Sequence, residues 1–220
     1  MTSPNMSPEV TRGFRLIPAP LIALTLSLAE RSSRLLVRLN VSPSALTVLG
    51  FLAGVTVGFF YAVERPGLAA AFLVVCGTFD ILDGQVAKNA NRKSLFGAIL
   101  DSSLDRYAEF FIYAGLAYHF RHGWGLWLMF FAFLGSTMVS YTRARAEGLG
   151  VDCQMGIMQR AERLLLLFLG TAAGIIFRVI DPALVVVMTF IAVISNITAV
   201  QRIFYVKRCE KSRLSKEGDP

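Results

Sequence analysis

The sequence predicts an all-α, polytopic membrane protein with six transmembrane helices and an N-terminal amphipathic helix that lies in the membrane interface. Apolar residues make up 55% of the 220 residues, and the mean hydropathy is +0.57, which is more apolar than ordinary soluble domains. These residues are concentrated in runs of about 20, the length at which a helix crosses the hydrocarbon core. The basic residues gather mainly at the ends of those runs.

Six runs are predicted to span the membrane: residues 45–64, 68–89, 94–119, 126–146, 161–180 and 182–206. Ser42 and Pro43 have the capping and proline chemistry of a helix start just before the first run. Breaker-rich connections are expected at Arg65-Pro66-Gly67, Arg121-His122-Gly123 and Asp181-Pro182. The chain is therefore divided into an N-terminal segment (1–42), a six-helix domain (43–206) and a polar cytoplasmic tail (207–220).

The segment before the first span has no pattern of a cleavable signal peptide. Its apolar run, residues 19–29, is 11 residues long, which is too short to span a membrane. Arg31, Arg34 and Arg38 follow, interleaved with apolar residues. This pattern is typical of a helix that lies in the membrane interface.

The distribution of lysine and arginine predicts that both termini and the active site face the cytoplasm, in the cell membrane. The connections after the first, third and fifth runs carry only Arg65, Arg121 and Arg178, while the other polar segments carry almost all the rest. The net charge of +7 therefore points to membrane lipids and phosphorylated substrates as partners, and not to nucleic acid. Three scattered cysteines fit neither a disulfide framework nor a zinc site.

Four aspartates in the second and third runs are predicted to form one cluster inside the membrane. Asp80 and Asp83 are three residues apart, and Asp101 and Asp105 are four apart, so each pair shares one helix face. Counted from the short turn 89–93 between these antiparallel helices, both pairs lie roughly 9–17 Å deep. Ionisable residues at that depth are costly and usually functional, and hard carboxylate oxygens suit Mg²⁺, Mn²⁺ or Ca²⁺.

Spacing alone leaves several interpretations of this cluster open. A cation- or proton-coupled transporter would also use intramembrane carboxylates. A proton relay, or a structural ion pair between an aspartate and Arg106, would explain a single buried charge. An enzyme site that binds metal and phosphates explains four carboxylates in facing register.

The residues around the aspartates form the pattern Asp80-x-x-Asp83-Gly84-x-x-Ala87-Lys88, then eight residues, then Gly97-x-x-x-Asp101-x-x-x-Asp105. This resembles the signature of the CDP-alcohol phosphotransferase family at every fixed position but one. Lys88 stands where the family usually has arginine, which keeps the charge but loses the bidentate fork. Upstream, Pro43-x-x-x-Thr47-x-x-Gly50 is similar to the family's first-helix pattern, with Ser44 in place of its common asparagine.

The resemblance implies transfer of a phosphatidyl group from a CDP-linked lipid, CDP-diacylglycerol, to an alcohol, with release of CMP. It implies two divalent cations, Mg²⁺ or Mn²⁺, and it suggests a homodimer. Asp80, Asp83, Asp101 and Asp105 would bind metal, and Asp105 would also be the base that accepts the hydroxyl proton. The residues implied for the CDP-linked substrate are Thr47, Gly84, Ala87, Lys88, Ser94 and Gly97.

Each small residue of this pattern is expected to have a physical role. Gly84 and Ala87 would leave space for a base or ribose beside the aspartates. Gly97, one turn before Asp101, would permit a close helix approach. Ser94 is expected first of all to cap a helix.

Arginines near the cytoplasmic ends of the last three runs carry guanidinium forks that match phosphate well, and each could instead be a positive-inside anchor or a partner for Glu147 or Glu162. The resemblance narrows to the actinobacterial phosphatidylinositol-phosphate synthases and the archaeal inositol-phosphate-using enzymes, and it implies that the matching positions here, Arg143, Arg145, Arg163 and Arg202, bind the phosphate of the acceptor. This makes inositol phosphate the first choice of acceptor. Glycerol 3-phosphate, the acceptor of a phosphatidylglycerophosphate synthase, is the alternative. For Arg160 two interpretations stay open, a contact with phosphate and a contact with lipid head groups.

Overall fold

The computed structural model describes residues 19–92, 94–153, 156 and 158–217. These residues form seven α-helices: α1 Ala19–Arg38, α2 Pro43–Ala62, α3 Pro66–Asn89, α4 Leu95–His119, α5 Gly125–Gly148, α6 Arg160–Ile176 and α7 Ile180–Glu217. The prediction of an all-α protein is confirmed for this part of the chain. The first 18 residues of the predicted N-terminal segment, and the last three of the polar tail, lie outside the described residues.

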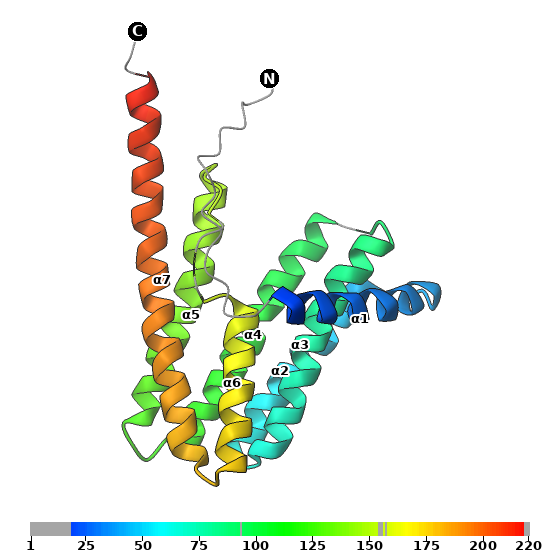
Figure 1. Ribbon diagram of the computed structural model, residues 1–220, viewed down its shortest axis with the longest axis vertical. Coiled ribbons are helices and arrows are strands. Elements are labelled where there is room, and N and C mark those ends of the chain that lie inside the picture. Colours follow the sequence, from blue (N-terminus) through cyan, green and yellow to red (C-terminus); the bar gives the residue numbers. More distant parts are fainter. Residues whose placement is uncertain (1–18, 93, 154–155, 157, 218–220) are drawn as a thin grey trace.

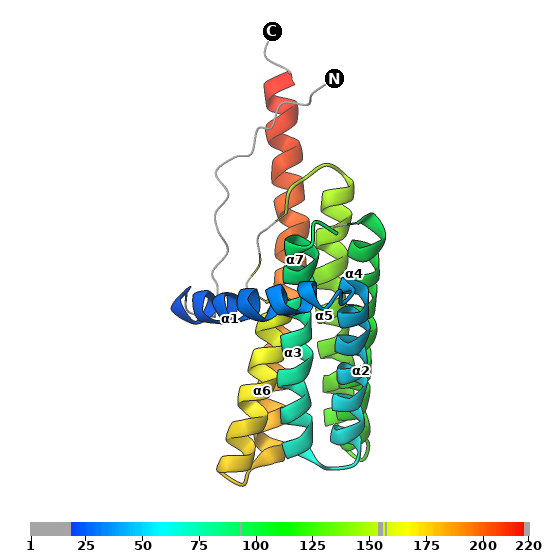
Figure 2. The same ribbon diagram turned by 90° about the vertical axis from the view of Figure 1, so that its right-hand side faces the viewer.

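Helices α2 to α7 form a bundle, and α1 lies across one side of it (Figures 1 and 2). Their main contacts close a ring in the order α2, α3, α6, α7, α5, α4 and back to α2. Helix α1 packs on α3, where the Asn89 side chain donates a hydrogen bond to Ser33 Oγ at 2.7 Å. Helices α3 and α4 therefore meet mainly through α2, although they follow each other in the sequence.

Glycines bring α2 and α4 into backbone contact. Gly50, Gly54 and Gly58 form a stripe on α2 with a spacing of four residues. A Cβ atom on Gly54 would lie 2.7 Å from Ala108 Cβ, and one on Gly115 would overlap the carbonyl group of Gly58. Such contacts allow close helix approach in membranes, so Gly54 and Gly58 fix the position of α4 against α2, while Gly50 faces α3.

Two buried hydrogen bonds join helices inside the bundle. The hydroxyl groups of Tyr61 on α2 and Thr171 on α6 are 2.6 Å apart. Those of Tyr113 on α4 and Ser136 on α5 are 2.8 Å apart. Each pair satisfies polar groups that lie among apolar side chains.

The last helix differs from its predicted span at both ends. Asp181 and Pro182, which were expected in a connection, lie in the first turn of α7, where proline sacrifices no helical hydrogen bond. The turn is formed by residues 177–179 instead, and Arg178 adopts the left-handed conformation with φ 58°. The polar tail continues as a helix through Glu217, so α7 projects beyond the other helices (Figure 1).

Within the described residues, four helices are long and apolar enough to cross a membrane: α2, α3, α5 and the Ile180–Lys211 part of α7. Only 28–39% of their apolar windows is buried inside the protein. Large apolar side chains such as Phe59, Phe131 and Phe190 therefore face outward, which is typical of a lipid-facing exterior. The chain is an integral membrane protein. Helix α6 has 17 residues and α4 carries several charges, so neither belongs to these four.

Candidate active site

The four aspartates lie near the turn that joins α3 to α4, at the end of the bundle crossed by α1. Asp83 is buried, with 6% of its surface exposed, while Asp80, Asp101 and Asp105 are half-buried. Asp83 interacts electrostatically with Asp80 and Asp101, and Asp105 interacts with the same two residues. The structure thus gathers the carboxylates of α3 and α4 into one cluster.

Helix α2 supplies the surface on which the α3 aspartates rest. The buried Thr47 hydroxyl lies 2.9 Å from Asp83 Oδ2 and donates a hydrogen bond to it. A Cβ atom on Gly50 would lie 3.2 Å from Phe79 Cβ and 3.5 Å from Asp80 Oδ1. A larger residue at position 50 would therefore crowd the start of the cluster.

Arg160, the first residue of α6, inserts its guanidinium group between the two aspartate-bearing helices. Its Nε donates to Asp80 Oδ2 at 2.8 Å, and its Nη2 lies 3.2 Å from Asp105 Oδ1. Its Nη1 donates to the Asp105 carbonyl oxygen. The side chain is only 11% exposed, so the expected alternative of a contact with lipid head groups is wrong for this structure. Local sequence patterns do not reveal this bridge, because 80 residues separate Arg160 from Asp80.

A second arginine of α6 is paired one turn deeper. Arg163 Nε and Nη2 donate to the two carboxylate oxygens of Glu109 at 2.6 and 3.1 Å. Arg163 Nη1 also donates to the Met158 carbonyl oxygen at 3.0 Å. Both charged side chains are almost fully buried, and Arg106 Nε lies 4.0 Å from Glu109 Oε2. Arg163 is thus held in place by α4 before it meets any ligand.

The cluster fits a hard divalent cation by the chemistry of its donors. In the part of the chain that the structure describes, no three acidic, histidine or cysteine side chains lie close enough together to hold a metal ion. However, carboxylates are the preferred ligands of Mg²⁺ and Mn²⁺, and four of them interact here. The positively charged guanidinium group of Arg160 lies between Asp80 and Asp105, so the space between these two carboxylates accommodates a cation.

The small residues of the motif differ in their surroundings. A Cβ atom on Gly84 would meet no atom within 4 Å, so the surface beside Asp83 is open there. Ala87 is half-buried, and Lys88 is exposed in the last turn of α3. Ser94 caps α4, as predicted, and its Oγ accepts a hydrogen bond from the Gly97 backbone N–H at 2.9 Å.

The expectation for Gly97 is wrong in this structure. A Cβ atom there would meet only Ser94 Oγ, at 3.0 Å, and no neighbouring helix. The close approach to α4 is made by Gly54, Gly58 and Gly115 instead. The spacing of four residues along α2 was the signal that could have shown it.

The four arginines predicted for the acceptor phosphate are only partly gathered. Arg202 is buried on α7, donates to the Val139 carbonyl oxygen, and interacts electrostatically with Arg143 and Arg163. Arg143 is exposed and forms an ion pair with Glu147 at 2.8 Å. Arg145 is exposed on α5. The backbone of Gly156 packs against Arg202, since a Cβ atom there would lie 2.9 Å from Nη2.

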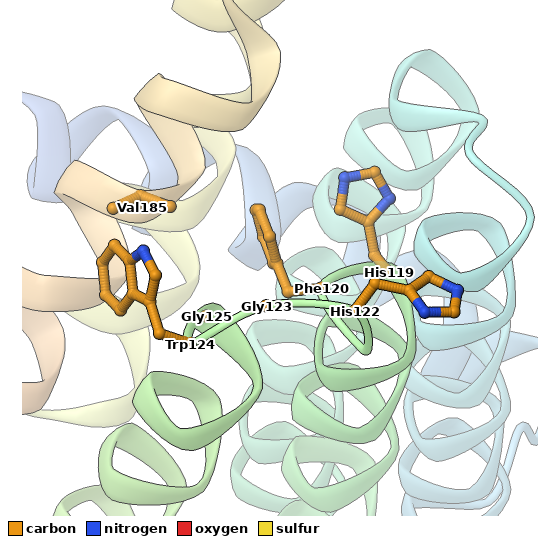
Figure 3. A pocket seen from close by; sticks show the side chains of 7 residues that line it. All are labelled: His119, Phe120, His122, Gly123, Trp124, Gly125 and Val185. Carbon is orange, nitrogen blue, oxygen red and sulfur yellow. The ribbon is translucent and has the colours of Figure 1, made fainter.

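A separate cavity of about 250 Å³ lies at the far end of α4, away from the aspartates. His119, His122 and Trp124 contribute to its lining (Figure 3). His119 Nε2 lies 2.8 Å from Asp181 Oδ1, which ties the α4–α5 connection to the start of α7. The lining includes none of the four aspartates, so this cavity is not part of the candidate site.

These features define a class of protein. It is a helical membrane protein that carries carboxylates and arginines from five helices, α3 to α7, toward one end of its bundle, a combination suited to cations and phosphorylated substrates. The chain belongs to the CDP-alcohol phosphatidyltransferase family, whose model matches residues 40–204. The matched region contains every predicted site residue, and the family makes the chain an enzyme of this class rather than a transporter.

Two relatives are named as synthases of inositol phosphate lipids. The chain is 37% identical to the archaetidylinositol phosphate synthase of Methanothermobacter thermautotrophicus over 172 residues, which are 77% of this chain and 85% of that protein. It is 34% identical to the phosphatidylinositol phosphate synthase of Mycobacterium marinum over 182 residues, 79% of this chain and 77% of that protein.

Solved structures of the Mycobacterium tuberculosis phosphatidylinositol phosphate synthase have the same fold. One, with CDP-DAG bound, has a TM-score of 0.74 and 30% identity, and the match covers 82% of this chain and 94% of that chain. Another, in complex with manganese and citrate, has a TM-score of 0.73 and 30% identity, with 81% and 88% covered.

Proposed function

We propose that this protein transfers the phosphatidyl group of CDP-diacylglycerol to inositol phosphate and releases CMP. The observation that carries the proposal is the aspartate cluster of α3 and α4, which lies inside the region matched by the family model. The relatives named for inositol phosphate products support this choice of acceptor, and the CDP-DAG complex of a relative supports the donor.

In the proposed reaction, a hydroxyl oxygen of the acceptor attacks the phosphorus that carries the diacylglycerol. The bond from this phosphorus to the CMP oxygen breaks, and CMP leaves with the bonding electrons. The acceptor proton passes to the Asp105 carboxylate, which is half-buried and flanked by the guanidinium groups of Arg160 and Arg106. These two charges keep the carboxylate oriented, so positioning supplies much of the rate.

Asp80, Asp83, Asp101 and Asp105 are the proposed ligands of two divalent cations, Mg²⁺ or Mn²⁺. Bound metal would neutralise charge on the diphosphate of the donor and on the leaving CMP. Thr47 orients Asp83 through its hydrogen bond. The manganese complex of the relative supports a divalent ion in this family.

The CDP group is proposed to lie against the open surface at Gly84, with Ala87 and Lys88 along the same part of α3. Thr47, Ser94 and Gly97 complete the proposed set. Ser94 and Gly97 contribute by fixing the start of α4 beside it, because the Ser94 hydroxyl is already engaged by the Gly97 N–H.

The acceptor phosphate is proposed to bind between α5, α6 and α7. Arg202 interacts electrostatically with both Arg143 and Arg163 there, and Arg145 completes the set from the exposed face of α5. Three donations from Arg163 go to Glu109 and Met158. A guanidinium group has five N–H donors, so the others are proposed to meet the phosphate.

We further propose that α2 to α7 all span the cell membrane, with α1 in the interface and both termini and the site in the cytoplasm. Helix α6 is short and α4 is charged, but each packs between two other helices of the ring, so their polar groups need not face lipid. A homodimer, as the resemblance suggests, completes the proposed assembly.

The test is an assay of purified protein in detergent with radiolabelled CDP-diacylglycerol, Mg²⁺ and a panel of polyol phosphates. We expect a labelled lipid product and equimolar CMP with inositol phosphate. Product with glycerol 3-phosphate alone would replace the proposed acceptor and leave the reaction type intact. No product with any acceptor would reject the proposed function.

A further inference from the structure

Arg160 contacts two of the carboxylates that we assign to metal binding, and it contacts them from a third helix. Asp80 belongs to α3, Asp105 to α4 and Arg160 to α6. The same guanidinium group lies 2.8 Å from Asp80 Oδ2 and 3.2 Å from Asp105 Oδ1. The guanidinium group therefore occupies one oxygen of each of two carboxylates that we assign to the metal.

The strength of this contact depends on burial. The Arg160 side chain is 11% exposed, and those of Asp80 and Asp105 are 25% and 19% exposed. Charges in such surroundings are screened by water and salt much less than surface charges. A unit positive charge here offsets a substantial part of the repulsion among the aspartates.

The backbone beside Arg160 is fixed. The Glu162 carboxylate accepts a hydrogen bond from the Gln159 backbone N–H, in the arrangement of a capping box. Arg163 is anchored one turn further on by Glu109. Any change in the position of the Arg160 charge must therefore come from rotation of its own side chain.

We propose that Arg160 is the resident counter-cation of the aspartate cluster and that it competes with the divalent metal for Asp80 and Asp105. This inference rests on the metal ligands of the proposed function. Metal entry then requires the guanidinium group to give up at least one of the two carboxylates. Arg160 is a positioning residue in this scheme, and it sets how tightly the site holds its metal.

The experiment measures Mn²⁺ binding to purified protein, without substrates, by the loss of the electron paramagnetic resonance signal of free Mn²⁺. Removal of a partly buried competing charge in Arg160→Gln should tighten Mn²⁺ binding by about tenfold or more. Arg160→Lys keeps a charge but loses the planar fork that spans both carboxylates, so we expect a smaller gain of about threefold.

Two control variants test whether the gain in Mn²⁺ affinity is specific to the charge of Arg160 and whether the ion binds at the aspartate cluster. Arg121→Gln removes the same charge at the far end of α4, where Arg121 donates to the Tyr118 carbonyl oxygen, and should leave Mn²⁺ affinity unchanged. Asp101→Asn should abolish or strongly weaken binding in both the wild-type and the Arg160→Gln backgrounds. That loss would place the measured ion at the aspartate cluster.

Unchanged or weaker Mn²⁺ binding in folded Arg160→Gln protein would overturn the competition while leaving the metal site of the proposed function in place. If Arg160→Gln does not fold, Arg160→Lys decides, and affinity equal to or below wild type overturns the proposal. Absence of Mn²⁺ binding in the wild type would reject the metal assignment itself, and the competition with it.

Discussion

At the scale of single residues, Asp83 and Asp105 have different neighbours, and this suits them to different tasks. Asp83 is buried and accepts a hydrogen bond from Thr47, so its orientation is fixed by α2. Asp105 lies between the guanidinium groups of Arg160 and Arg106 and keeps 19% of its side chain exposed. A carboxylate oriented by a buried hydroxyl suits a metal ligand, and one that is partly exposed and flanked by positive charges suits a group that accepts a proton from substrate.

Asp105→Asn should lower the rate of CMP release by about 10²–10⁴-fold, the usual contribution of a general base. Asparagine preserves the shape of the side chain, so the variant should elute at the wild-type position in gel filtration and keep its helical circular dichroism. Turnover close to that of the wild type would reject the role of Asp105.

Thr47→Val removes the hydroxyl group that donates to Asp83 and should raise the Mg²⁺ concentration needed for half-maximal activity. Loss of one such hydrogen bond costs about 1–3 kcal/mol when the acceptor stays buried. Thr56→Val is the matched control, because Thr56 lies on the same helix, is half-buried and donates only to its own helix, at the Leu52 carbonyl. Thr47→Ser should restore the wild-type requirement. An equal effect of Thr47→Val and Thr56→Val on the Mg²⁺ dependence would contradict the orienting role.

At the scale of helices, α6 holds the site together with two arginines on successive turns. Arg160 reaches α3 and α4, and Arg163 is paired with Glu109 of α4. These ion pairs lie on the side of α6 that faces the inside of the ring. Helix α6 therefore links the proposed metal site to the proposed phosphate site through charged side chains.

Glu109→Gln should destabilise the folded protein by about 3–5 kcal/mol, because it leaves the buried Arg163 without its charge partner. Thermal unfolding in detergent measures the effect. Glu147→Gln is the control, since its partner Arg143 is exposed and such pairs contribute about 0–1 kcal/mol. The double variant Glu109→Leu/Arg163→Met should recover stability without recovering activity. A stable Glu109→Gln protein would show that the pair is not the main link between α4 and α6.

The elements follow from the sequence more fully than the contacts between them. Apolar runs and the caps at Ser42 and Ser94 predicted the helices to within a few residues, because these are local properties. The facing aspartates could be predicted because their two helices are joined by a short turn. The Arg160 bridge and the Glu109–Arg163 pair could not, because they depend on which helices become neighbours in the ring. Local pattern also misplaced the end of α7, since its polar residues continue the helix.

At the scale of the whole molecule, the closed ring places α4 between α2 and α5, with its charged face toward other helices. Its backbone is in contact with α2 at Gly58 and Gly115. The ring therefore turns the charged residues of α4, which are Asp101, Asp105, Arg106 and Glu109, toward other helices, while side chains such as Tyr107 and Phe110 face outward. The helices that flank α4 in the ring, α2 and α5, come from different parts of the sequence.

This placement has a consequence for how the protein is made. A charged residue at the centre of a helix costs about 2.5–3.5 kcal/mol on insertion through the translocon, so α4 alone should insert poorly. We expect efficient insertion in a glycosylation-mapping assay only when α2 and α3 precede it, and a decrease when Gly58→Leu blocks the contact with α2. Efficient insertion of α4 by itself would contradict this dependence.

Within α4 only Arg106 faces Asp105 and Glu109, and the further partners of these two acids, Arg160 and Arg163, are synthesised later with α6. Until then the glycine stripe of α2 is the surface that can hold the nascent catalytic helix in the bilayer. The active site is therefore completed late in biogenesis, because α4 enters the membrane before Arg160 and Arg163, which pair with its acidic residues, have left the ribosome.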